Sequence, residues 1–183
     1  VGSEMCIRDS PRIANYQIKV RLEPRERMIY GEEIVEWNNR TNSSTSELQF
    51  HLYLNAFRND QSSFMKESGA QWGTKMIKRN GWGYIEVNHI ELADGKDLTD
   101  RIQFIHPDDD NEQDKTVFRL PLPSPVKPGE KIKLNIKFTA KLPSPAFARS
   151  GAWKDFFFVA QWFPKHGVFE QGKWNCHCRL YTS

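Results

Sequence analysis

The sequence lacks the patterns that mark several large classes of protein. Three cysteines, at positions 6, 176 and 178, provide no disulfide framework and do not reveal the compartment. The longest apolar run is Phe156 to Ala160, far short of the ~18 residues of a membrane-spanning helix, so we expect no membrane span. Its 26 Lys and Arg and 23 Asp and Glu are spread along the chain without a basic run, so nucleic acid is not an expected partner.

Motifs of catalysis are also missing. None of the five histidines begins the His-Glu-x-x-His pattern of a zinc peptidase helix, and no Gly-x-Ser-x-Gly nucleophile elbow occurs. The glycines of residues 69–73 and 81–83 alternate with tryptophan instead of opening a helix, as a phosphate-binding loop would. We therefore expect no catalytic residue in this chain.

Two short segments contain metal-ligating residue types. Residues 176–178 read Cys-His-Cys, but neighbours in an extended chain point to opposite faces and cannot close around one ion unaided. The acidic run 108–112 lacks the spaced ligands and the glycine of a calcium loop, and we expect a solvated hairpin tip there. The sequence therefore predicts no metal site.

Large apolar residues are plentiful. The chain has 183 residues, of which 38% are hydrophobic and 13% aromatic, which is enough to bury a core and too apolar for a disordered segment. No internal repeat or linker divides it. We expect one domain over residues 11–178.

Period-two alternation predicts strands along most of that domain. Each predicted strand has one apolar and one polar face, and turn residues such as Asp94-Gly95 separate them. The proline-rich stretch 121–128 is expected to be a rigid connection between strands, and residues 59–67 are expected to form a short helix or loop insertion. The fold class predicted is all-β, mainly antiparallel, as a saddle-shaped β-sandwich. The clearest expected strands are 16–22, 28–38, 48–54, 82–92, 101–105 and 131–139.

Both ends of the chain look foreign to this domain. Residues 1–10 lack an initiating Met and the features of a signal peptide, and residues 179–183 have a similar look. Each is either a non-native tail or an ordinary disordered terminus. If the tails are non-native, the chain is a fragment of a longer protein.

Two segments carry a family resemblance. Residues 50–59 read Phe-His-Leu-Tyr-Leu-Asn-Ala-Phe-Arg-Asn, and residues 156–178 run from Phe-Phe-Phe-Val through a Gln-Trp-Phe-Pro corner to Cys-His-Cys. Together they resemble the amino-terminal β domain of bacterial aminopeptidase-N-like zinc metallopeptidases of the gluzincin type, over residues 11–178. The resemblance implies a non-catalytic domain that supports a following catalytic domain and borders its peptide-binding cleft.

The resemblance also implies roles for particular residues. Gln161 would lie at the cleft near the substrate, and Phe163 occupies a position where many members carry Glu or Gln. We expect Trp162 and Trp174 to pack at the junction with the catalytic domain, leaving an apolar patch around residues 156–176 in this chain alone. The implied partners are that missing carboxyl-terminal domain and a peptide substrate.

The same resemblance places the cofactor and the compartment. Zinc would be held by the missing domain of the parent, and this chain would hold no cofactor and be inactive alone. Relatives of this branch imply an extracytoplasmic location.

A stand-alone β-sandwich binding module is the alternative. It would bind carbohydrate or protein, and Trp72, Trp82 and Trp153 would serve as stacking platforms for sugar rings. Exposed coplanar tryptophans would favour this alternative.

Overall fold

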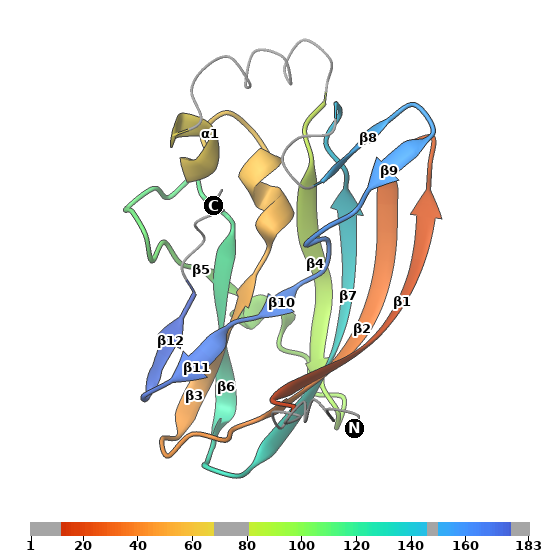
Figure 1. The fold of residues 1–183 in the computed structure, drawn as a ribbon. Coiled ribbons are helices and arrows are strands. Elements are labelled where there is room, and N and C mark those ends of the chain that lie inside the picture. The colour runs from red at the N-terminus through yellow and green to blue at the C-terminus, as the bar shows by residue number, and fades with distance from the viewer. Residues whose placement is uncertain (1–11, 68–80, 146–149, 177–183) are drawn as a thin grey trace, which may run out of the picture.

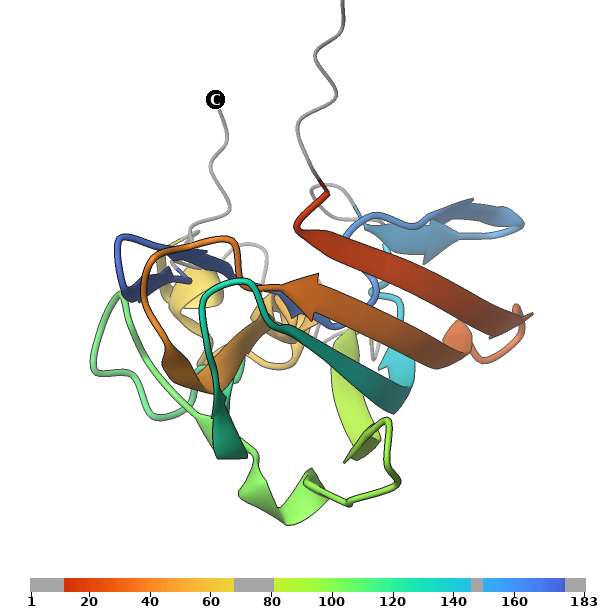
Figure 2. The same cartoon turned by 90° about the horizontal axis from the view of Figure 1, so that it is seen from below.

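The computed structural model describes residues 12–67, 81–145 and 150–176, which form two antiparallel four-stranded sheets facing each other (Figures 1 and 2). Sheet A has the strand order β1-β2-β7-β4, and sheet B has the order β10-β3-β6-β5. Sheet A consists of β1 (Ala14–Glu23), β2 (Met28–Asn38), β7 (Lys131–Lys141) and β4 (Tyr84–Leu92). Sheet B consists of β10 (Lys165–His166), β3 (Thr45–His51), β6 (Val117–Val126) and β5 (Gln103–Phe104). The predicted all-β, mainly antiparallel sandwich is confirmed.

The remaining elements are short. Two hairpins join the sandwich, and the helical turns include α1, which lies in the segment predicted to be a helix or loop. The hairpins are β8 (Gly151–Trp153) with β9 (Phe156–Phe158), and β11 (Val168–Glu170) with β12 (Lys173–Asn175). The helical turns are η1 (Tyr53–Phe57), α1 (Ser63–Glu67) and η2 (Thr99–Arg101). No helix in the described ranges has the length and apolar character needed to cross a bilayer.

Alternation along the strands builds the core between the sheets. In β7 the apolar residues at even positions point inward, while the lysines and polar residues between them point outward. Each large apolar side chain that is fully buried contributes about 1.5–3 kcal/mol, so this one-sided pattern is what drives the two sheets together. The largest fully buried side chains are Phe50, Phe118, Phe138, Leu48, Leu52, Leu54, Ile85, Ile90, Leu98, Leu120 and Leu134.

Gly31 allows the closest approach within the core. It lies on the inner side of β2, opposite Phe138 of β7, and a Cβ atom at position 31 would collide with the Phe138 ring. Glycine has no Cβ, so the aromatic ring can lie directly over the backbone of the neighbouring strand. Gly31 is therefore a packing feature within one continuous strand.

Two strand boundaries differ from the sequence prediction. The strand predicted over 48–54 ends at His51. The Leu52 N–H still donates to the Thr116 carbonyl at 2.7 Å, but the Leu52 carbonyl accepts from the backbone N–H of Asn55 at 2.9 Å and opens η1. The strand predicted over 101–105 is only Gln103–Phe104, preceded by η2.

The proline-rich connection was predicted wrongly. β6 continues through Pro121, Pro123 and Pro125 as far as Val126. The three prolines occupy alternate positions, so their missing N–H groups lie along one edge of the strand. β5 pairs only with residues 118 and 119 of β6, so in the described part of the chain no strand needs those donors.

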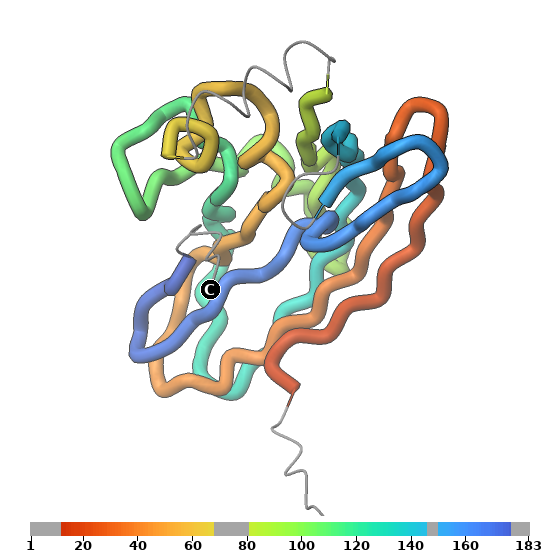
Figure 3. Tube along the Cα trace, turned by 45° about the horizontal axis from the view of Figure 1, so that its top comes forward, coloured from red at the N-terminus to blue at the C-terminus, as the bar shows by residue number. Residues whose placement is uncertain are grey.

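The chain after β9 crosses from sheet A to sheet B (Figure 3) and closes one side of the sandwich. The N–H of His166 donates to the Tyr16 hydroxyl at 3.0 Å, which links β10 to the edge strand β1. The His166 ring stacks on Trp37 at 5.1 Å between centroids, and burial lowers the pKa of His166 to about 4. An aromatic cluster therefore holds the crossing segment in place.

Residues 1–10 and 179–183, predicted to be tails, lie outside the described residues, and so do Trp72 and Cys178. The predicted domain limits stay predictions.

Candidate functional site

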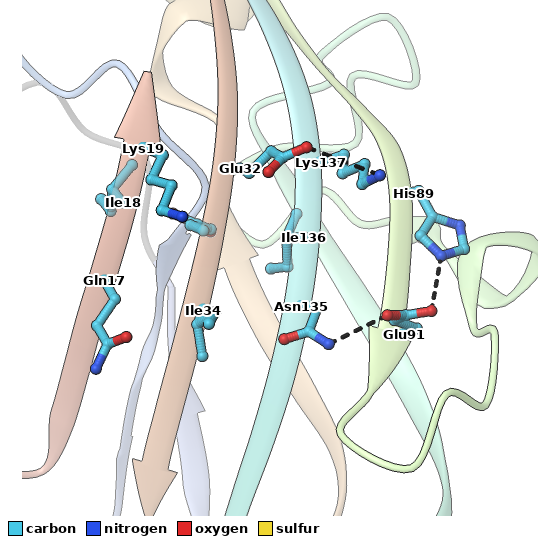
Figure 4. Close-up of a pocket in the computed structure, with 11 residues that line it drawn as sticks. Gln17, Ile18, Lys19, Glu32, Ile34, His89, Glu91, Asn135, Ile136 and Lys137 are labelled. Carbon is cyan, nitrogen blue, oxygen red and sulfur yellow. Dashed lines mark hydrogen bonds and ion pairs between the residues drawn. The ribbon is translucent and has the colours of Figure 1, made fainter.

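A hollow of about 600 Å³ lies on the outer face of sheet A (Figure 4). Its volume falls within the ~300–1,000 Å³ that is usual for sites binding small ligands. Polar side chains from β1, β2, β7 and β4 line it: Gln17, Lys19, Glu32, His89, Glu91, Asn135 and Lys137, with Ile34 among them.

Strand register arranges these side chains in rows across the sheet. The first row is Gln17, Ile34, Asn135 and Glu91, and the second is Lys19, Glu32, Lys137 and His89. Neighbouring strands are about 4.8 Å apart, so each row of four spans about 14 Å. The hollow is therefore a shallow polar surface with an apolar floor at Ile34.

The β4 side of the hollow is held by hydrogen bonds. The Asn135 amide donates to Glu91 at 3.1 Å, and His89 Nε2 lies 3.1 Å from the other Glu91 oxygen. These contacts, His89 first, lower the pKa of Glu91, so its carboxylate is ionised at neutral pH. Thr99 Oγ1 lies 3.3 Å from His89 Nδ1, which fixes the ring from its other side. This side of the hollow is preorganised.

The β1 side is open. Gln17 and Lys19 are exposed on the edge strand, and in Figure 4 the Lys19 side chain extends toward β2. Neither side chain has a hydrogen bond or ion pair with any residue of the described ranges, so the amide and the ammonium group are available to a ligand. The hydrogen-bonded side chains on the β4 side of the hollow therefore lie across from β1 side chains that are available to a ligand.

Glu33 lies directly behind this surface and belongs to the core. It is 1% exposed, and neither carboxylate oxygen has a hydrogen-bond partner among the described residues. Burial raises the pKa of Glu33 to about 8, so the group is neutral at pH 7. Nearby, burial raises the pKa of Tyr16 to about 12.

The arrangement of these polar groups suits the binding of a ligand. The polar groups surround a surface with an apolar floor, as in a site that orients a ligand. In the ranges that the structure describes, no three His, Cys, Asp or Glu side chains group as a metal site requires.

The residues predicted from the resemblance lie elsewhere. Gln161 is at the corner after β9 with φ 53°, and Phe163 packs edge-on against Tyr16 at 5.4 Å. Trp162 packs on Phe138 at 6.0 Å, and Trp174 packs on Trp37 at 5.7 Å. The four are therefore half-buried along the crossing segment and β12, on the core side of the molecule.

The predicted stacking platform is incomplete. Trp82 packs against the core cluster, while Trp153 is 48% exposed on β8 and Trp72 lies outside the described residues. Beside Trp153, Phe156 and Phe158 of β9 are 63% and 45% exposed. An exposed aromatic surface therefore lies on the β8–β9 hairpin, and only its β9 part falls within the segment 156–176 that was predicted to carry an apolar patch.

The sequence analysis missed the hollow entirely. Its residues are ordinary polar side chains on the outer face of predicted strands, and only strand pairing brings Gln17 into one row with Asn135 and Glu91. The one indication in the sequence is that the outward positions of these strands include amides and a histidine as well as lysine and glutamate.

Comparison with known proteins overturns the family prediction. No family model matches the chain, and no curated protein matches it. A matching solved structure is the CBM3a-L domain of the cellulosome scaffoldin of Clostridium thermocellum, with 11% identity, coverage of 88% of each chain and a TM-score of 0.33. That domain is a carbohydrate-binding β-sandwich and not an aminopeptidase amino-terminal domain.

The assignment to the aminopeptidase-N-like metallopeptidases, with its proteolytic function, is therefore corrected. With 11% identity and a TM-score of 0.33, the likeness to the scaffoldin domain carries no argument about the ligand of this chain. The roles predicted for Gln161, Trp162, Phe163 and Trp174 rested on the aminopeptidase resemblance alone.

Proposed function

We propose that this chain is a carbohydrate-binding β-sandwich module whose ligand lies in the hollow on the outer face of sheet A. The observation that carries the proposal is the convergence of hydrogen-bonding side chains from three strands on an apolar floor. Gln17 comes from β1, Asn135 from β7 and Glu91 from β4, and Ile34 of β2 lies between them.

A sugar ring fits the chemistry of this surface. Sugar hydroxyls both donate and accept hydrogen bonds, and the amides of Gln17 and Asn135 do the same. Glu91 accepts only and Lys19 donates only, so the rim offers partners of each kind. The C–H face of a sugar ring is apolar and would cover Ile34. Because the hollow is open to solvent, it suits a sugar unit within a longer chain.

The proposal is tested by measuring glycan binding to the whole chain. Wild-type protein is screened on immobilised polysaccharides, and the affinity for the best oligosaccharide is then measured by calorimetry. The double variant Gln17→Ala with Asn135→Ala should bind about tenfold more weakly or worse, because each lost hydrogen bond contributes about 0.5–1.5 kcal/mol.

A matched control uses one glutamine and one asparagine elsewhere. Gln113 and Asn175 are exposed and lie outside sheet A, so Gln113→Ala with Asn175→Ala should keep the wild-type affinity. Equal binding by both double variants would overturn the proposed site. A wild-type chain that binds no glycan in the screen would overturn the function.

A further inference from the structure

The hollow continues along the strands into two more hollows on the same face of sheet A. A second hollow, of about 510 Å³, shares Lys19, Glu32 and Lys137 with the first. A third, of about 490 Å³, shares Tyr30 with the second and reaches the turn between β1 and β2. We call the three together the trough.

Strand pairing places two more rows of outward side chains along the trough, after the two rows of the first hollow. The third row is Arg21, Tyr30, Thr139 and Glu86, and the fourth is Glu23, Met28, Lys141 and Tyr84. Alternate residues of a strand are about 7 Å apart, so four rows extend about 20 Å. This length suits an oligosaccharide of several units.

Charge is distributed unevenly along the trough. The outward side chains of the first hollow include two cations and two anions: Lys19 and Lys137, Glu32 and Glu91. The second and third hollows together contain six basic residues and two acidic ones: Lys19, Arg21, Lys137, Arg25, Arg27 and Lys141, with Glu26 and Glu32. The trough therefore becomes basic towards the β1–β2 turn.

Several of these cations are not neutralised. Glu32 lies 3.8 Å from Lys137, and Arg21 lies 3.6 Å from Glu23 while also covering the Tyr30 ring at 4.4 Å. Arg25 and Lys141, by contrast, form no ion pair with a carboxylate of the described ranges. Cations that face a hollow and form no ion pair with a neighbouring carboxylate favour an anionic ligand.

From these observations, and resting on the proposed function, we infer that the trough binds a linear acidic oligosaccharide. Its neutral hydroxyls occupy the first hollow, and its carboxylate or sulfate groups lie against Arg25 and Lys141 at the basic end.

The tyrosines at the basic end favour a glycan over a single-stranded nucleic acid. Nucleic-acid bases need exposed aromatic faces for stacking. The Arg21 guanidinium lies over Tyr30, and the Arg58 guanidinium lies over Tyr84 at 5.7 Å. These two rings therefore serve as supports for cations.

The test measures the affinity of the whole chain for oligosaccharides of equal length and different charge. The probes are an oligogalacturonate, a heparin-derived oligosaccharide and a neutral galactan oligosaccharide. Both acidic probes, or one of them, should bind about tenfold more tightly than the neutral one, and added salt should reduce the difference. Preference for the first acidic probe identifies carboxylate as the anion, and preference for the second identifies sulfate.

Variants of Arg25 and Lys141 test whether these two cations cause the preference for acidic over neutral oligosaccharides. Arg25→Gln with Lys141→Gln should abolish the preference for acidic probes, whereas Lys141→Arg should retain it. The matched control is Lys127→Gln with Lys173→Gln, which removes two exposed cations away from the trough. Circular dichroism and melting temperature verify that each variant is folded.

The outcomes separate the two proposals. Equal binding of neutral and acidic probes overturns the acidic ligand and leaves the carbohydrate-binding function standing. Acidic binding that survives Gln17→Ala with Asn135→Ala overturns the first hollow as the sugar site. An oligothymidylate that binds as tightly as the acidic glycans, or full competition by inorganic sulfate, overturns the inferred ligand class.

Discussion

The two faces of sheet A have opposite chemistry although the same four strands build both. Glu32 and Glu33 are consecutive residues of β2 that illustrate the difference. Glu32 is exposed on the outer face, 3.8 Å from Lys137, whereas Glu33 is buried on the inner face without a hydrogen-bond partner among the described residues. A one-residue step along a strand therefore separates a surface suited to ligands from a core that stabilises the fold.

The largest expected effect comes from the inner face. Phe138→Ala should lower the free energy of unfolding by about 3–5 kcal/mol, because it leaves a cavity at the centre of the sandwich. Thr139→Ala changes the next residue, on the outer face, and should cost no more than about 0.5 kcal/mol. Urea unfolding measures both, and similar losses would refute the assignment of the two faces.

The next largest expected effect comes from Glu33, which should make the free energy of unfolding depend on pH. Its pKa is about 8 in the folded chain, against an ordinary value of 4.5, so the unfolded state loses this proton at lower pH. Stability should therefore fall as pH rises through 8, by about 2 kcal/mol between pH 6.5 and 8, and should level off above about pH 9.

The pH window is chosen to avoid His166. The pKa of His166 is lowered to about 4 from 6.5, so this group makes stability rise with pH below 6.5, opposite to Glu33. In Glu33→Met and Glu33→Gln the slope between pH 6.5 and 8 should disappear, and Glu33→Met should be the more stable variant at pH 8. A wild-type slope in Glu33→Met would show that another group titrates.

The smallest expected effect is on the β8–β9 hairpin, which repeats the contrast of the two faces. Phe156 is 63% exposed, whereas Phe157 packs against the core. Phe156→Ser should change the free energy of unfolding by no more than about 0.5 kcal/mol, and Phe157→Ser should cost clearly more. Thermal melts compare the two variants, and a larger loss for Phe156→Ser would contradict this orientation of the hairpin.

Much of the fold could be predicted from alternation alone. The strands β1, β2, β4 and β7 follow from period-two patterns, because one face of each is buried. The path of β6 could not be predicted in this way, because Pro121, Pro123 and Pro125 are compatible with a strand only if their shared edge is unpaired. The end of β3 at His51 depends on η1, since alternation continues past it in the sequence.

The candidate site could not be predicted from the sequence. Gln17 and Asn135 are far apart in the chain and meet only because β2 pairs with both β1 and β7. The aminopeptidase resemblance rested instead on aromatic-rich segments, and in the structure Phe50, Trp162 and Trp174 pack in or against the core. Except at the exposed Phe156 and Phe158, aromatic density in these segments therefore reflects packing.

Gly31 determines which sequences this fold can accept. Because the Phe138 ring occupies the space of a missing Cβ, any side chain at position 31 must displace that ring within the packed core. Position 32, which faces solvent, has no such restriction. In a library of random substitutions selected for folding, position 31 should stay glycine while its neighbour varies freely, so the composition of the trough can change without loss of the sandwich beneath it.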